Sequence, residues 1–284
     1  MGRGTVLQDE NETGKRGRLV SVMSSENWAL ILGASSGFGA ATARTLAKAG
    51  FGIFGVHLDR RATLGLVEAL KKEIEASGQE ALFFNVNASS DEKRAEVIGA
   101  IKEKLGSKGP RIRVLMHSLA FGTLKPFVGG KDEPINKAQM DMTLDVMAHS
   151  LVYWTQDLVR EDLLGEGTRI VAMTSSGGER VFPYYGAVSA AKAALESHIR
   201  QLSMELISKG ISANSIRAGV TDTPALRKIP GNERMLEAAT RRNPGGRLTK
   251  PEDVAEAICA LALSGCHWLT GNVIGVDGGE NTVE

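Results

Sequence analysis

The stretch "ILGASSGFGAATA", residues 31–43, decides the fold. An apolar run ends at Gly33, and Gly37 and Gly39 stand where a helical pattern begins. A glycine at the end of a strand permits a tight turn. Glycines at the start of a helix let the backbone approach a pyrophosphate, whose charge suits the helix N-terminus. Three glycines can also form a plain turn, so the surrounding pattern must show whether a nucleotide binds here.

Short apolar runs alternate with amphipathic segments along the rest of the chain. The runs that predict strands are 28–33, 51–57, 81–86, 112–119, 169–175, 211–218 and 271–279. Helical patterns between them cover 39–50, 62–78, 91–106, 137–164, a segment around Lys192 that runs to about Lys209, and 251–263. This alternation predicts an α/β fold, a doubly wound parallel sheet (Rossmann fold) in a single domain over 27–284. Ligands of such a fold bind at the carboxyl ends of the strands.

Composition excludes several other classes of protein. The chain has 284 residues, 42% hydrophobic, with a formal net charge of +1, which argues against disorder and against a general attraction to nucleic acid. No apolar run approaches the roughly 20 residues needed to span a bilayer. Residues 1–26 are polar and lack the apolar centre of a signal peptide, so we expect a flexible extension on a cytoplasmic protein. The two cysteines and five histidines show no metal-ligand spacing, and no metal site is predicted.

The glycine spacing GxxxGxG resembles the short-chain dehydrogenase/reductase family, and the similarity extends from about Asn27 to Gly279. Later segments fit in order, including "AGVTDTPAL" at 218–226 and "LTGNVIGVDGG" at 269–279. The resemblance implies a bound nicotinamide dinucleotide. The positions that it assigns to this cofactor are Gly33, Ser35, Ser36, Gly37, Phe38, Gly39, Asn87 and Ala88 at the adenine, Ser118, Lys192, and Val220 and Thr223 at the nicotinamide carboxamide and phosphate.

The choice between NADH and NADPH depends on the segment "GVHLDRRAT", residues 55–63. Asp59 is a candidate partner for the ribose, and Arg60 or Arg61 are candidate partners for a 2′-phosphate. The two arginines can equally be solvated residues at a helix start. Because His57, rather than an acidic residue, stands directly at the end of the strand, the sequence leans slightly towards NADPH.

A tyrosine and a lysine indicate the chemistry. Tyr185 precedes Lys192 with six residues between them, and Val188 stands where most of the family has its tyrosine, four residues before the lysine. The Tyr-(x)6-Lys spacing resembles the enoyl-acyl-carrier-protein (enoyl-ACP) reductases, as do "MHSLAFG" at 116–122 and "GGERVFPYY" at 177–185. Many of these enzymes have another tyrosine where this chain has Ser175, while a second branch has serine there.

The resemblance implies NAD(P)H-dependent reduction of the trans-2 double bond of enoyl-ACP thioesters by a homotetramer. In this reading Tyr185 donates a hydrogen bond or proton to the enolate oxygen, and Ser175 adds a hydrogen bond to the thioester oxygen. Lys192 holds the nicotinamide ribose and, as a cation, lowers the pKa of the phenol. Tyr184 is expected to line the pocket or to pack.

Two alternatives stay open at this point. A ketone or hydroxysteroid reductase could use the same pocket through Tyr185, and a catalytically silent protein would bind the dinucleotide without turnover. The segment from about 225 to 242 is expected to be a mobile lid over the substrate. Its basic residues form either a docking rim for the acidic acyl carrier protein or a solvated helix face.

Overall fold

The computed structural model describes residues 27–106 and 112–283, so the prediction of a flexible extension over 1–26 lies outside the described residues. The strands are β1 (Trp28–Leu32), β2 (Gly52–His57), β3 (Ala81–Asn85), β4 (Ile112–His117), β5 (Arg169–Thr174), β6 (Ser212–Ala218) and β7 (Val273–Val276). They form one parallel sheet in the order β3-β2-β1-β4-β5-β6-β7. The predicted doubly wound α/β fold is confirmed.

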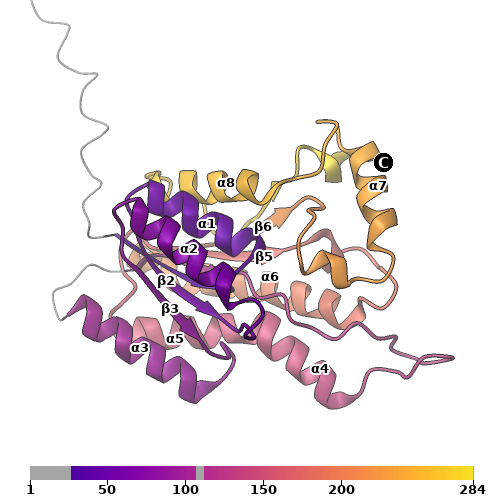
Figure 1. The fold of residues 1–284 in the computed structure, drawn as a ribbon, viewed down its shortest axis with the longest axis horizontal. Coiled ribbons are helices and arrows are strands. Elements are labelled where there is room, and N and C mark those ends of the chain that lie inside the picture. Colours follow the sequence, from indigo (N-terminus) through magenta and orange to yellow (C-terminus); the bar gives the residue numbers. More distant parts are fainter. Residues whose placement is uncertain (1–26, 107–111, 284) are drawn as a thin grey trace, which may run out of the picture.

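Helices cover both faces of this sheet (Figure 1). They are α1 (Gly37–Lys48), α2 (Leu64–Ala76), α3 (Asp91–Leu105), α4 (Lys137–Leu144), α5 (Ser150–Arg160), α6 (Gly186–Leu206), α7 (Asn232–Arg242) and α8 (Pro251–Leu263). α1, α2 and α8 pack on one face, and α3, α5 and α6 pack on the other. This two-sided cover explains why the central strands β1, β2 and β4 are mostly apolar rather than alternating with polar residues.

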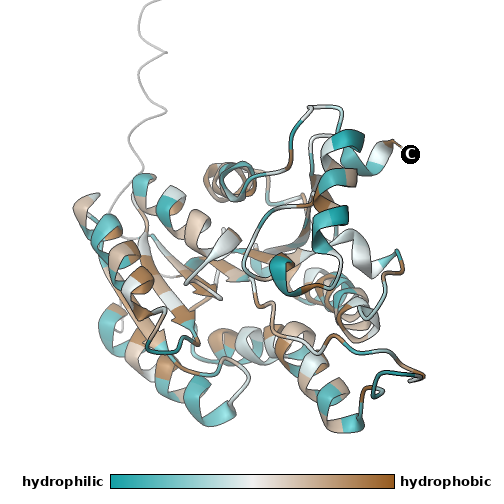
Figure 2. Cartoon of the chain, turned by 45° about the vertical axis from the view of Figure 1, so that its right-hand side comes forward, coloured by the Kyte–Doolittle hydropathy of each residue, from teal (hydrophilic) through white to brown (hydrophobic). Residues whose placement is uncertain are grey.

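The two faces have separate hydrophobic cores, and β1 contributes to both. Trp28, Leu30 and Leu32 point to the core under α3, α5 and α6, while Ala29 and Ile31 point to the core under α1, α2 and α8. All five side chains are buried, at most 3% exposed. Successive residues of a strand face opposite sides, so a strand buried on both sides has an apolar residue at every position. Figure 2 shows the strands in brown between helices whose outer faces are teal.

The long helix predicted over 137–164 is interrupted in the structure. α4 ends at Leu144, a π-helix η1 (Asp145–His149) follows, and α5 begins at Ser150. Periodicity alone did not reveal this, because a single wide turn leaves the apolar pattern on each side intact. A π-turn inside a helix is uncommon, and many of the known examples lie at functional sites. No helix in the described ranges is both long and apolar enough for a membrane span.

Candidate active site

The glycine turn has the geometry that close backbone approach requires. Gly33 has φ +92°, and a Cβ there would lie 2.4 Å from the carbonyl oxygen of Ser118. A Cβ on Gly39 would lie 2.0 Å from the carbonyl oxygen of Gly33. Gly37 has φ +52° and faces the methyl group of Thr223. Because side chains are excluded here, backbone amides at the start of α1 are left open to an anionic group, which fits the predicted pyrophosphate.

Other predicted cofactor residues lie in the segments that follow β1 and β3, at the edge of the sheet that holds this turn. Ser36 is the exposed N-cap of α1, and its side chain makes no capping hydrogen bond. Phe38 packs against the core beneath α1. Ala88 is buried, and its carbonyl accepts a hydrogen bond from Trp154 at 2.8 Å. The Asn87 side-chain oxygen accepts from Ser89. The structure therefore gathers the ends of β1, β3, β4 and β6 on one edge, as the predicted nucleotide site requires.

Asp59 joins the end of β2 to the glycine turn. Its carboxylate accepts from Thr63 Oγ1 at 2.6 Å and contacts His57 Nδ1 at 3.0 Å. Burial alone would raise the pKa of Asp59, but hydrogen bonds from Thr63, Ser35 and His57 outweigh it and bring the pKa below its ordinary value. The side chain is therefore a carboxylate at neutral pH. Arg60 is exposed to solvent.

The predicted catalytic tyrosine lies just before the first residue of α6. Tyr185 is the N-cap residue of α6, and Lys192 lies inside the helix. The ring of Tyr185 is close to Gly177, where a Cβ would lie 2.5 Å from its edge, and Ser175 Oγ lies beside the same position. Ser175 and Tyr185, ten residues apart in the chain, are thus brought together at the end of β5.

The pKa of Tyr185 contradicts one expectation. Burial raises this pKa above its ordinary value, and a hydrogen bond with Ser175 opposes the rise. The pKa of the phenol is therefore raised, not lowered as we expected from the Lys192 cation, because burial of the ring is the largest effect on it. The phenol keeps its proton at neutral pH and remains a donor.

Lys192 is buried at 6% exposure. Its Nζ donates a hydrogen bond of 2.7 Å to the carbonyl of Met173, two residues before Ser175. Burial lowers the pKa of Lys192 to about 8, and the nearby Glu196 carboxylate acts in the opposite direction. At neutral pH the side chain is therefore mostly a cation, able to donate its other hydrogens to hydroxyl groups of a ligand.

Glu196 is a buried acid that sequence analysis missed. It follows Lys192 by one helical turn, is 8% exposed and accepts a 2.5 Å hydrogen bond from Thr174 Oγ1. Met173 and Thr174, consecutive in β5, thus hold the lysine and the glutamate side by side. The i, i+4 spacing of Lys192 and Glu196 was the available signal, but surface helices show the same spacing commonly.

His117 lies beneath the site, at the end of β4, and is fully buried. Its Nε2 lies 2.9 Å from Ser150 Oγ, which itself donates to the Val146 carbonyl, so Nε2 carries the proton. Nδ1 is buried with no hydrogen-bond partner among the described residues. Burial, and then the Lys192 cation, lower the pKa of His117 to about 3. The imidazole is therefore neutral and holds the π-helix, rather than exchanging protons at neutral pH.

This low pKa predicts acid sensitivity. The unfolded chain binds a proton at His117 below pH about 6.5, and the folded chain does not until about 3. Stability is thus lost as pH falls through this window, by ~2 kcal/mol from this group at pH 5. Urea unfolding measures the free energy of unfolding at pH 7 and at pH 5. This free energy should fall less between the two pH values in His117→Gln than in the wild type, and the glutamine amide can still donate to Ser150. Equal falls in both proteins would contradict the assignment.

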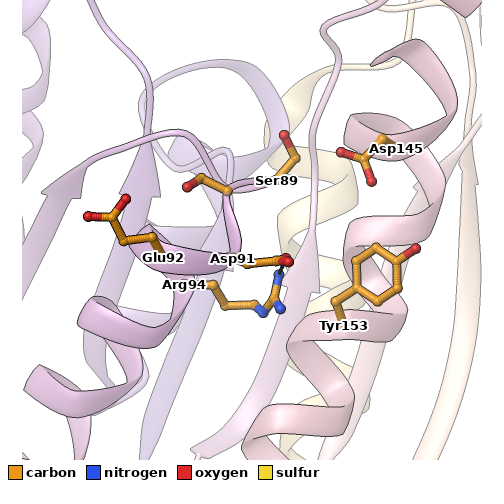
Figure 3. Close-up of a pocket in the computed structure, with 7 residues that line it drawn as sticks. Ser89, Asp91, Glu92, Arg94, Asp145 and Tyr153 are labelled. Carbon is orange, nitrogen blue, oxygen red and sulfur yellow. Dashed lines mark hydrogen bonds and ion pairs between the residues drawn. The ribbon is translucent and has the colours of Figure 1, made fainter. Parts of the chain in front are cut away.

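The hollow drawn in Figure 3 lies apart from these residues, between α3 and α5. It measures about 570 Å³, and Arg94 is the cation that lines it. The Arg94 guanidinium bonds to Asp157 at 2.6 Å and to Asp91 at 2.9 Å, and it lies over the ring of Tyr153. With its charge already paired, Arg94 joins the two helices and provides no anion site.

Fold and side chains together define a class: an α/β nucleotide-binding protein with a protonated tyrosine and a buried lysine next to the nucleotide edge. Comparisons with known proteins narrow this class. The sequence profile of the family described as enoyl-(acyl carrier protein) reductase matches residues 33–281. The chain belongs to this family of the short-chain dehydrogenase/reductase superfamily. It is an NAD(P)H-dependent oxidoreductase.

Individual relatives are distant, and their names describe more than two activities, including a 1-cyclohexenylcarbonyl-CoA reductase of Streptomyces collinus that is 28% identical over 89% of this chain and 86% of the relative. The NADH-named enoyl-[acyl-carrier-protein] reductase of Aquifex aeolicus is 29% identical over 213 residues, covering 75% of this chain and 77% of the relative. Its crystal structure aligns with TM-score 0.76 and 26% identity, over 90% of this chain and 96% of that one. A 3-oxoacyl-[acyl-carrier-protein] reductase of Thermotoga maritima is also 29% identical, over 88% of this chain and 96% of the relative.

Proposed function

We propose that this protein reduces the trans-2 double bond of enoyl thioesters carried on acyl carrier protein. The observation that carries the proposal is the position of the phenol. Val188, at the place of the usual ketone-reducing tyrosine, is 5% exposed and part of the core, while Tyr185 stands beside Ser175 at the end of β5. The acid therefore lies towards the start of α6, which suits a substrate whose reacting atom is displaced from that of a ketone.

The nicotinamide, when bound, supplies the hydride. Tyr185, kept protonated by burial, donates to the thioester oxygen as negative charge develops there. Ser175 adds a second hydrogen bond to the same oxygen in this proposal. Lys192, held by the Met173 carbonyl, binds the ribose hydroxyls as a cation. Gly33, Gly37 and Gly39 hold the pyrophosphate through the backbone at the start of α1.

The competing function is ketone reduction, which the Thermotoga maritima relative favours through its higher coverage. Purified protein should be assayed with a trans-2-enoyl thioester and a 3-ketoacyl thioester, each with NADH and with NADPH. Turnover of the enoyl substrate with little ketone activity is the expected result. Ketone turnover alone would replace our proposal with the alternative, and cofactor binding without turnover of either would indicate a silent protein.

We propose NADH as the preferred cofactor, although the sequence alone slightly favoured NADPH. The enoyl-[acyl-carrier-protein] reductase of Aquifex aeolicus, similar to this chain, is named for NADH. In this chain the Asp59 carboxylate lies by Ser35 in the glycine turn, and its negative charge would oppose a 2′-phosphate. The sequence favoured NADPH because Asp59 lies two residues beyond the end of the strand. In the structure, contacts with His57 and Thr63 hold the Asp59 carboxylate at the end of β2.

Replacement of Asp59 tests this preference. Asp59→Asn should weaken NADH binding and relieve repulsion of NADPH, changing the ratio of the two Kd values roughly 10-fold, or ~1.4 kcal/mol. Fluorescence titration with each cofactor measures it. The paired variant Arg60→Ala should leave the NADH Kd unchanged. A large loss of NADPH binding in Arg60→Ala, with no change in Asp59→Asn, would restore the NADPH assignment.

The substrate carrier and assembly are also proposals. Two of the five basic side chains expected on the lid are paired within the chain, Arg227 with Asp222 and Arg242 with Glu280. A docking rim for acyl carrier protein would then use the remaining ones, Lys228, Arg234 and Arg241. We also propose a homotetramer, as the family resemblance implies.

A further inference from the structure

Glu280 is a buried acid that the proposed mechanism does not use. It opens the short 3-10 helix η5 (Glu280–Thr282) after β7 and is 2% exposed. Its Oε1 accepts from Arg242 Nη2 at 2.7 Å, and its Oε2 accepts from the backbone N–H of Val220 at 2.9 Å. One carboxylate thus connects two segments that lie 22 residues apart in the chain (242 − 220).

The two partners belong to different parts of the site. Val220 follows β6, in the segment whose Thr223 methyl faces Gly37 of the glycine turn. Arg242 is the last residue of α7, the helix of the expected lid. The carboxylate therefore lies between the backbone at the nucleotide edge and the end of the lid helix.

The fit around this carboxylate is close. A Cβ on Gly219 would lie 2.9 Å from Glu280 Oε2 and 2.3 Å from Thr249 Oγ1, so the backbone there can approach only because residue 219 is glycine. The chain after α7 is fixed to the same place, since Asn243 Nδ2 donates to the Asp277 carbonyl at 2.8 Å. A displacement of the Val220 backbone would therefore also displace the Glu280 carboxylate.

Few side chains of α7 are buried against the rest of the protein. Within the helix Ala239 is the only buried residue, and most of its other side chains are polar (Figure 2). Figure 1 shows α7 beside the C-terminal segment, away from the layer formed by α1 and α8. A cation at the last turn also suits the partial negative charge of a helix C-terminus. The ion pair of Arg242 with Glu280 is thus a charged contact that holds the C-terminal end of α7.

We infer that Glu280 is a positioning residue that couples the lid helix α7 to the backbone of Val220. Ordering of Val220 by a bound nicotinamide fixes the carboxylate, and the carboxylate then orders α7 through Arg242. The assignment of Val220 to the nicotinamide end rests on the proposed function. Closure of the lid would in this way follow cofactor binding rather than substrate binding alone.

Amide hydrogen exchange with and without NADH tests the coupling in the full chain. In the wild type, NADH should slow exchange both in residues 219–223 and in residues 232–242. Glu280→Gln keeps an acceptor for the Val220 N–H and removes the charge that holds Arg242. NADH should then still protect 219–223, while its protection of 232–242 falls roughly 10-fold or more, because a charge-assisted bond is replaced by a neutral one.

Asp253→Asn is a matched control. Asp253 also bonds to an arginine, Arg247, and to a backbone N–H, that of Lys250, but it is more exposed and lies outside the lid. This variant should keep wild-type protection of 232–242. Arg242→Lys, which retains the charge without the planar donor group, should give intermediate protection and serves as the test if Glu280→Gln does not fold.

The inference is overturned if NADH leaves 232–242 unprotected in the wild type, or if Glu280→Gln or Arg242→Lys keeps full protection. A loss of protection in the Asp253→Asn control would overturn it as well. The exchange measurement needs no enoyl thioester. A protein that shows the coupling but does not turn over the enoyl substrate would therefore refute the proposed function and support the inference.

Discussion

Tyr185→Phe is expected to lower kcat for the enoyl thioester by roughly 10²- to 10⁴-fold, the usual contribution of a positioned proton donor. The variant keeps the ring, its burial and its edge contact with Phe182, whose centroid lies 5.9 Å away. NADH affinity should therefore stay within about 2-fold of the wild type, since Lys192 and the glycine turn are untouched. Steady-state kinetics and fluorescence titration measure the two quantities separately.

Tyr184→Phe is the matched control, because it removes the hydroxyl of the neighbouring tyrosine. That hydroxyl donates to Asp132 at 2.9 Å and lies at an exposed position. We expect kcat to change by less than about 3-fold, since an exposed hydrogen bond contributes little. If Tyr185→Phe kept most of the activity while Tyr184→Phe lost it, the proton donor would be Tyr184 and the Tyr-(x)6-Lys assignment would be wrong.

Gly39→Ala is expected to remove most cofactor binding. The added methyl group would overlap the Gly33 carbonyl oxygen, 2.0 Å away, so either the turn or the start of α1 has to move. Overpacking of this kind costs ~1–3 kcal/mol of stability. Because the moved atoms are those expected to hold the pyrophosphate, NADH affinity should fall by roughly 100-fold or more, or ~2.7 kcal/mol.

Gly99→Ala shows what the same change does where space is available. Gly99 lies within α3, and a Cβ there meets nothing within 4 Å. Its replacement should stabilise the fold by ~0.5–1 kcal/mol, as alanine does in a helix, and leave NADH binding unaltered. Thermal unfolding measures the stability of both variants, and NADH titration measures their cofactor affinity. Wild-type affinity in Gly39→Ala would show that the cofactor does not bind at this turn.

The elements and the nucleotide edge were predictable because they follow from local patterns. Apolar runs buried on both faces marked the central strands β1, β2 and β4, and Gly33 and Gly39 marked the turn by their place between strand and helix. Tyr185 and Lys192 were found by spacing, although the pKa direction of Tyr185 depends on burial, which spacing does not reveal. The features that the sequence predicted correctly depend on residues that are close together in the chain.

Contacts between distant residues were not predictable. Glu280 finds Arg242 across 38 residues only after β7 and α7 have been placed, and neither side chain has a motif. Tyr184 has φ +63°, a conformation that a bulky residue rarely adopts and that no composition rule would predict next to the candidate acid. The sequence favoured NADPH, and we propose NADH instead, because the contacts of Asp59 with His57, Thr63 and Ser35 form only in the folded chain.

The π-helix η1 has a consequence for variation in length. A π-turn accommodates one residue more than an α-turn would, since its hydrogen bonds run from i to i+5. Elsewhere in a helix, loss of one residue rotates everything beyond it by about 100°. Within α5 this would turn Trp154, now fully buried, out of the core. Within 145–149 the same loss converts a wide turn into a regular one, so relatives of different length can align there without a change of helix face.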